Sequence, residues 1–177
     1  SEKEVHTAMT ESSETEELLF MIKKIGLNLS ARMELSLKNR DLTGVQVYFL
    51  VYILRHHPDG TYLTELYHEI GVSKATLSAL IKKLKGKNYL CFLEDPEDIR
   101  KKKILPSEKL LKEREGFLQE TERMETEILS VLDRQEQIQL KNLEEKLIRQ
   151  FAEMEQKEKN RQEVIYSEKS IAAAGKV

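Results

Sequence analysis

The chain has 177 residues, which is enough for one domain with a substantial hydrophobic core. Charged residues make up 34% of it and aromatic residues 6%, and only 7 glycines and 3 prolines interrupt it, a composition that favours long helices over a sheet-rich fold. The formal net charge of −2 neither supports nor excludes a polyanionic partner, so the distribution of charge along the chain matters more than its total.

Compartment and membrane contact are constrained by simple counts. Cys91 is the single cysteine and cannot form an internal disulfide, which fits a reducing compartment. The first residues contain no apolar signal-peptide core. The longest unbroken apolar run, Val47 to Leu54, is 8 residues, far below the roughly 20 that a membrane span needs. We therefore expect a soluble, cytoplasmic protein with no membrane partner.

The N-terminal third predicts one long helix after a polar arm. Residues 1–12 are polar and are predicted to be disordered. Ser13 with Glu16 three residues later is typical of a capping box, so the helix is predicted to begin there and to occupy residues 13–42. One apolar stripe follows at spacings of three and four: Leu18, Ile22, Ile25, Leu29 and Met33.

A buried helix is predicted next. Thr43 with Gln46 forms a second capping-box pattern, and residues 45–54 are apolar almost all round. A helix without a polar face has to be central and buried. The turn signal His57-Pro58-Asp59-Gly60 ends it.

Two short helices follow and form a helix-turn-helix. Thr64 is predicted to cap the first helix, and Gly71 ends it because glycine accepts the left-handed backbone of a helix C-terminus. Ser73 is predicted to cap the second helix, which Asn88 closes. Leu77, Ile81 and Leu84 define the buried face of that second helix.

A β-hairpin is predicted directly after this unit. Residues 89–93 and 100–105 are rich in strand formers, Asp95-Pro96-Glu97-Asp98 is a turn between them, and Pro106 ends the second strand. A hairpin in this position is a wing, so residues 43–106 are predicted to be a winged helix-turn-helix lobe.

Two further helices are predicted over residues 107–160, the second capped by Asp133 with Glu136, followed by a weakly structured tail at 161–177. The fold class is therefore mainly α, a winged helix-turn-helix with long N- and C-terminal dimerisation helices in one globular domain. Apolar stripes on these helices need a partner surface, which predicts a homodimer. The expected interface residues are Leu18, Ile22, Leu140, Leu143, Leu147 and Phe151.

Positive charge is concentrated on the predicted lobe. Residues 74–103 carry a net charge of +5, whereas the rest of the chain carries −7. A basic face on a helix-turn-helix and wing complements the phosphates of duplex DNA, although most Lys-rich helices are merely solvated. The residues expected to contact double-stranded DNA are Ser73, Lys74, Ala75, Thr76, Ser78, Lys82, Arg100, Lys101, Lys102 and Lys103.

These segments resemble the MarR family of bacterial winged-helix transcription regulators. The resemblance spans roughly residues 14–155 and is carried by LTEL at 63–66, IGVSKATLS at 70–78, NYL at 88–90 and, most specifically, the turn Asp95-Pro96-Glu97-Asp98-Ile99-Arg100. It implies a homodimer joined by the N- and C-terminal helices, and a DNA-binding regulator that acts as a ligand-responsive repressor on a pseudo-palindromic operator. It also implies that Arg100 enters the minor groove.

The sequence departs from the family pattern at the wing. Ile99 stands where a second arginine is common, Asn88 replaces a usual glycine, and Pro106-Ser107 replaces a usual Leu-Thr. Asp98 is expected to support the wing by holding the Arg100 side chain through a charge-assisted hydrogen bond, the alternative being a surface ion pair of little energetic consequence.

An aromatic or anionic effector is what the resemblance implies, and Tyr48, Tyr52 and Phe117 could line its pocket, although core packing explains them more simply. No Gly-rich phosphate loop, nucleophile elbow or metal-hydrolase motif is present, so neither an enzyme nor a cofactor is expected. No metal site is expected either, because the later helices lack the His or Cys that would complete one. The remaining alternative is a structural coiled-coil dimerisation protein that does not read DNA sequence.

Overall fold

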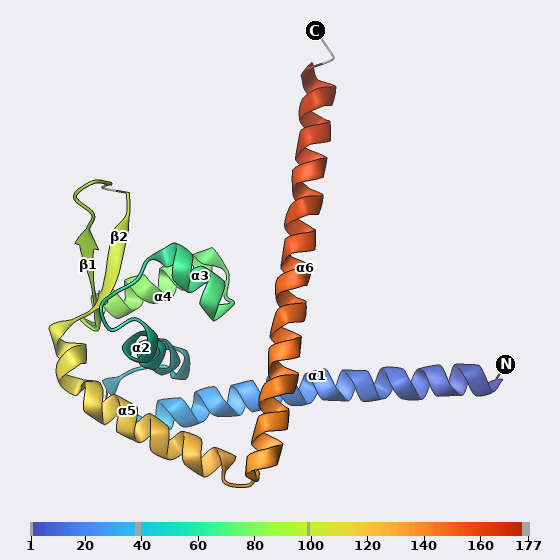
Figure 1. Ribbon diagram of the computed structural model, residues 1–177, viewed down its shortest axis with the longest axis horizontal. Helices are drawn as coiled ribbons and strands as arrows, with labels where there is room; N and C mark the ends of the chain where they lie inside the picture. Colours follow the sequence, from blue (N-terminus) through green and yellow to red (C-terminus); the bar gives the residue numbers. More distant parts are fainter. Residues whose placement is uncertain (1, 38–39, 99, 175–177) are drawn as a thin grey trace. The chain divides into compact units, whose positions relative to one another are not determined.

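The computed structural model describes residues 2–37, 40–98 and 100–174. The expected fold class is confirmed, because the described residues form helices and one antiparallel two-stranded hairpin (Figure 1). The elements are α1 (Glu2–Ser36), α2 (Gly44–His56), α3 (Leu63–Ile70), α4 (Lys74–Gly86), β1 (Leu90–Glu94), β2 (Lys102–Pro106), α5 (Glu108–Leu129) and α6 (Arg134–Ala174). One globular domain was predicted, whereas the chain divides into two compact units, residues 1–127 and 128–177.

Helix α2 is the centre of the first unit, as its apolar sequence predicted. Phe49, Leu50 and Ile53 are fully buried, and the core around them draws on α1, α3, α4, β2 and α5. The predicted capping box is present, since Thr43 accepts from the Gln46 N–H while the Gln46 side chain accepts from the Thr43 N–H. The buried residues of α2 belong to the same hydrophobic core as those of the helix-turn-helix.

Helix α1 meets α2 at very short range. A Cβ atom added to Gly44 would lie 1.9 Å from the Ser30 carbonyl oxygen, so a side chain at this position is excluded by the backbone of α1. Glu34 also accepts a hydrogen bond from the Gly44 N–H at 3.2 Å. The two helices therefore cross backbone against backbone.

The predicted start of α1 was wrong. The helix begins at Glu2 rather than at Ser13, so residues 2–12 continue the helix instead of forming a disordered arm. The physical reason is that neither glycine nor proline occurs before Gly26, and a capping-box pattern inside a continuous helical segment has no end to cap.

The helix-turn-helix consists of α3 and α4, with one correction. Tyr62, not Thr64, is the N-cap of α3, and the Glu65 side chain accepts from the Tyr62 N–H at 3.2 Å. Gly71 has φ +78 and ends α3 as predicted. Ser73 caps α4 by accepting from the Thr76 N–H, and Leu77, Ile81 and Leu84 are the buried residues of that helix, both as predicted.

The wing is an antiparallel hairpin in which Leu90 pairs with Pro106 and Glu94 with Lys102. Asn88 precedes it with φ +63, the left-handed backbone that an asparagine tolerates. Thr61 bridges to Ile104 and so fixes the middle of β2 to the segment before α3. Ile99, noted as a departure from the family pattern, lies outside the described residues.

Both C-terminal helices begin where predicted, and α6 ends later than predicted. Ser107 caps α5 by accepting from the Leu110 N–H at 3.1 Å, and Asp133 and Glu136 form the predicted capping box of α6. The predicted weakly structured tail from residue 161 was wrong up to Ala174, because α6 continues that far. Strong helix formers fill this segment, and no glycine or proline occurs in it before Gly175.

Candidate DNA interface

The outer face of α4 presents the side chains that the sequence assigned to DNA. The apolar residues Leu77, Ile81 and Leu84 fix one face of the helix against the core. Around this buried face, Ser73, Lys74, Ala75, Thr76, Ser78 and Lys82 are all exposed. All six residues predicted at the cap and along α4 are therefore accessible from solvent.

Within this surface, two polar side chains are engaged locally. The Ser73 hydroxyl donates to the Thr76 hydroxyl at 2.8 Å while accepting from the Thr76 N–H at 3.2 Å, so its first role is to cap α4. The Lys74 ammonium lies 5.1 Å from the centre of the Tyr67 ring, a cation–π contact from α3. Tyr67 was not predicted as a site residue, and only the fold reveals it beside Lys74.

The wing tip is held by carboxylates that accept from the backbone. Asp95 accepts from the Glu97 N–H at 2.9 Å, and the side chain of Asp98 accepts from the Arg100 N–H at 3.0 Å. The Asp98 carbonyl accepts from the Lys101 N–H at 2.9 Å. The hydrogen bond between Asp98 and Arg100 is thus made by the backbone N–H of Arg100, whereas the prediction placed it at the guanidinium. Arg100, Lys101 and Lys102 are exposed, and Lys103 is half-buried.

The three aromatic residues suggested for an effector pocket do not line one cavity. Tyr48 lines a groove of about 400 Å³ between α2, the α3–α4 turn and α4, together with Val45, Ile70, Val72 and Leu80. Phe117 is fully buried against Tyr89, with ring centres 6.1 Å apart.

Tyr52 belongs to a separate polar cluster that joins the end of α2 to α3. Its hydroxyl donates to Glu69 at 2.7 Å, and His57 Nε2 lies 2.7 Å from the same Glu69 oxygen. Burial, followed by this carboxylate neighbour, raises the pKa of Tyr52 to about 12. The hydrogen bonds from Tyr52 and His57 lower the pKa of Glu69. The cluster was not predicted, because the two carboxylate contacts depend on how α3 folds back onto α2.

Apolar side chains expected at a dimer interface lie exposed in each unit. On α1, Leu18 is 63% exposed and Ile22 50%. The α6 residues form an exposed row made of Leu140, Leu143, Leu147 and Phe151. This exposure is what an interface would cover, since contiguous apolar faces of this size are uncommon on monomers.

Among the described residues, no helix is both long and apolar enough to cross a membrane. Nor do three His, Cys, Asp or Glu side chains among them gather into a group that could hold a metal ion. Cys91 is exposed on β1, and its sulfur lies 3.7 Å from the Leu105 carbonyl oxygen.

Known proteins resemble this chain in its lobe and in its fold. No curated protein matches the chain. Residues 40–101, which run from the start of the lobe to the wing, match the family model described as "MarR family". The S. aureus MepR–DNA complex is similar in structure with a TM-score of 0.69 and 23% identity, covering 76% of this chain and 97% of that one.

Two further solved structures have the same fold. A MarR family regulator from Listeria monocytogenes, complexed with a 26mer DNA, has a TM-score of 0.68 and 21% identity and covers 76% of this chain and 89% of that one. The organohalide-sensing regulator RdhR in its 2,4-dichlorophenol-bound form has a TM-score of 0.66 and 18% identity and covers 75% of this chain and 79% of that one. Residues 40–101 thus resemble the MarR family, and the described chain shares the winged-helix fold of these solved regulators.

Proposed function

We propose that the protein acts in the cytoplasm as a homodimeric repressor that binds a pseudo-palindromic duplex operator. The observation that carries this proposal is the combination of an exposed polar face on α4 with a basic wing on the same lobe. Two-fold symmetry of a dimer presents two such lobes, so half-site centres are expected about one helical turn apart. The exposed apolar rows on α1 and α6 support the dimer.

In this proposal helix α4 and the wing make different contacts with DNA. Lys74, Ser78 and Lys82 enter the major groove, where side chains reach base edges. Arg100 enters the minor groove, whose negative potential is strongest where it is narrow. Lys101, Lys102 and Lys103 neutralise phosphates, and the backbone contacts of Asp98 keep the wing tip folded.

Response to a small aromatic or anionic effector belongs to the same proposal. It is supported by the fold shared with a regulator solved with 2,4-dichlorophenol. Of the three residues predicted to line the effector pocket, only Tyr48 opens onto the groove beside α4, so we retain it and leave Tyr52 and Phe117 to structural roles.

The test is a binding titration of four variants across an operator library at two salt concentrations. Arg100→Ala should weaken binding most on operators with A·T-rich flanks, and Lys102→Ala should weaken all operators equally while lowering the salt slope by about one. Lys74→Ala or Ser78→Ala should change the preferred bases, costing about 1–3 kcal/mol at the affected pair.

Two outcomes would contradict this proposal. If Arg100→Ala binds every operator as tightly as the parent protein, the wing does not read DNA. If the parent protein selects no duplex from a random library, the structural dimerisation protein becomes the better interpretation.

A further inference from the structure

The end of α4 is attached to the start of α5 through three successive main-chain carbonyls. The Lys109 ammonium approaches the Lys87 carbonyl at 3.5 Å. The Ser107 hydroxyl donates to the Asn88 carbonyl at 2.6 Å, and the Ser107 N–H donates to the Tyr89 carbonyl at 3.0 Å. These donors join the segment that follows α4 to the start of α5.

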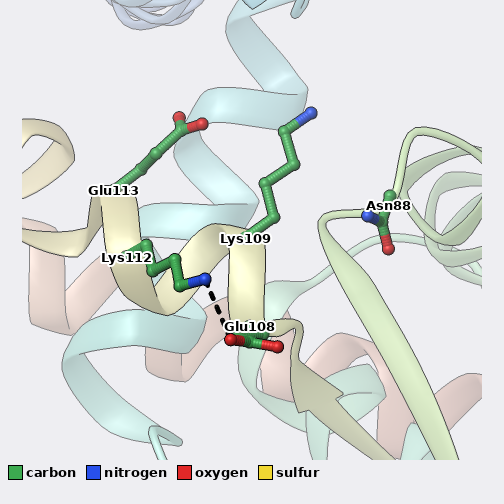
Figure 2. Close-up of a pocket in the computed structure, with 5 residues that line it drawn as sticks. All are labelled: Asn88, Glu108, Lys109, Lys112 and Glu113. Atoms are coloured by element: carbon green, nitrogen blue, oxygen red, sulfur yellow. Dashed lines mark ion pairs between the residues drawn. The ribbon is translucent and has the colours of Figure 1, made fainter.

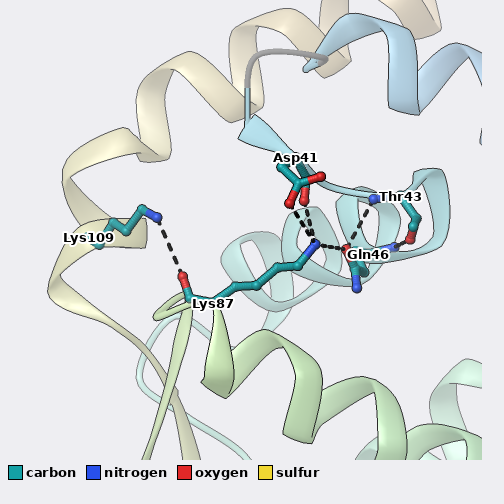
Figure 3. A network of polar contacts seen from close by, with 5 residues as sticks. All are labelled: Asp41, Thr43, Gln46, Lys87 and Lys109. Atoms are coloured by element: carbon teal, nitrogen blue, oxygen red, sulfur yellow. Dashed lines mark hydrogen bonds and ion pairs between the residues drawn. The ribbon is translucent and has the colours of Figure 1, made fainter.

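The side chain of Lys87 reaches in the other direction, to the junction between α1 and α2. Figure 3 shows its ammonium between Asp41 and Gln46. It donates to the Asp41 carbonyl oxygen and, at 3.2 Å, to Gln46 Oε1, and it lies 3.8 Å from the Asp41 carboxylate. Asp41 has a left-handed φ of +49, and Gln46 is buried and also completes the cap of α2. One residue therefore joins α4, the α1–α2 junction and α5.

Further contacts of α5 surround this contact of Lys87. Lys109 lies 4.1 Å from the centre of the Tyr89 ring. The hollow beside it, about 490 Å³ in volume, contains a Lys112–Glu108 ion pair of 2.9 Å (Figure 2). Glu113, on the same hollow, pairs with Arg40 at 2.7 Å. The first turns of α5 are thus fixed to the same junction that Lys87 contacts.

We propose that Lys87 is a positioning residue that sets the orientation of α4 relative to α1 and α5. Its ammonium is bonded to groups of the α1–α2 junction, so Lys87 holds the recognition helix by its C-terminus without belonging to the reading face formed by residues 73–82. In the dimer of the proposed function, on which this inference rests, the orientation of α4 determines the separation of the two recognition helices. Lys87 therefore determines which half-site spacing the protein accepts.

The experiment compares Lys87→Met with Lys83→Met, which removes the same charge from an exposed residue one turn earlier on α4. Each protein is titrated with operators whose half-sites are moved one base pair closer or farther, a change of about 3.4 Å and about 35°. The penalty for altered spacing should fall about fivefold in Lys87→Met, the lower end of coupling between sites. The base preferences within a half-site should stay as in the parent protein, and Lys83→Met should keep the parent's spacing preference.

An unchanged spacing preference in Lys87→Met, with a parent protein that discriminates spacing, would overturn the inference and leave the proposed function intact. A change of base preference in Lys87→Met would also overturn it, because Lys87 would then act as a reader. If the methionine variant does not fold, Lys87→Gln takes its place in the same titration.

A second measurement needs no DNA and separates the two proposals. Spin labels at Ser78→Cys on α4 and Glu115→Cys on α5, in a Cys91→Ser background and diluted with unlabelled protein, report the distance between the two helices within one chain. The distance distribution should be narrow in the parent protein and at least twofold broader in Lys87→Met. Equal widths overturn the positioning role, and this result holds even if the parent protein binds no duplex and the proposed function fails.

Discussion

The winged-helix lobe and the long helices α1 and α6 use apolar residues in opposite ways. In the lobe, Leu50, Leu66 and Leu77 are fully buried against residues of the same chain. On α1 and α6, Leu18, Leu143 and Phe151 are more than half exposed, although they follow an equally regular helical period. The lobe satisfies its hydrophobic surface within one chain, whereas these two helices do not. Regular spacing of apolar residues therefore indicates that a helix face needs to be covered. It does not indicate whether the covering residues belong to the same chain or to a second one.

The largest expected effect comes from placing charge on the exposed row of α6. Leu143→Asp with Leu147→Asp should convert the proposed dimer to a monomer, because two carboxylates would have to be buried in its interface. Operator affinity should then fall by about 10²–10⁴, the usual advantage of two linked binding sites. Sedimentation and DNA titration measure the two changes. Lys146→Asp, beside Leu147 and exposed, is the control that should stay dimeric. A dimeric double variant would show that the row faces no second chain.

Next in size is a cavity inside the lobe. Leu50→Ala should lower the free energy of unfolding by about 2–5 kcal/mol, because Leu50 is fully buried at the centre of α2. Denaturant unfolding checks this, provided that the slope of unfolding free energy against denaturant concentration is the same in both proteins. Because Leu50 packs within one chain, the loss of unfolding free energy should be equal at low and high protein concentration. The effect of replacing an interface residue should instead depend on protein concentration, through the dimer equilibrium. A loss that varied with concentration would place Leu50 in the interface.

A smaller effect is expected from the cap of the recognition helix. Ser73→Ala removes the acceptor for the Thr76 N–H and should cost about 1 kcal/mol of unfolding free energy. Ser73→Asp keeps an acceptor and should restore most of the stability, while its negative charge should weaken DNA binding. Thermal unfolding and operator titration of both variants separate the two roles. Equal stability of Ser73→Ala and the parent protein would contradict the capping role.

The smallest effect concerns acid stability at the Tyr52–Glu69–His57 cluster. The hydrogen bonds from Tyr52 and then His57 lower the pKa of Glu69 in the folded protein. Its contribution to stability is therefore present above the ordinary glutamate pKa of about 4.3, and it is lost as the pH falls through the lower folded value. The difference in Tm between the parent protein and Glu69→Gln should be largest at neutral pH and should decrease toward pH 3. A constant difference over this range would mean that the carboxylate contributes no linked protonation.

The sequence allowed prediction of those parts of the fold that depend on local chemistry. The caps at Thr43, Ser73 and Asp133 were correct because each side-chain oxygen accepts from the N–H three residues later. The similar pattern at Ser13 and Glu16 marked no helix start, because α1 already begins at Glu2. Helix ends without such local signals were missed. Residues 2–12 and 161–174 are helical because nothing in them stops a helix, and composition alone does not register the absence of a stop.

The candidate site divides in the same way. The exposed face of α4 followed from the period of Leu77, Ile81 and Leu84 and was predictable. The contact of Tyr67 with Lys74 and that of Lys87 with Asp41 were not, because each joins residues of two elements whose packing no local pattern determines. Asp98 was assigned to the wing tip, but the donor it accepts from is a backbone amide and not a side chain, since the tight turn brings the Arg100 N–H closest.

The crossing at Gly44 has a mechanical consequence. A side chain between two helices can accommodate a small displacement by changing its rotamer before either backbone moves. Here the α-carbon of Gly44 lies against the main chain of Ser30, and no rotamer is available to absorb a shift. A tilt of α1 is passed directly to the first turn of α2 and to the Thr43 cap. The contact between α1 and α2 is therefore stiff, and one methyl group at residue 44 would be enough to force the two helices apart.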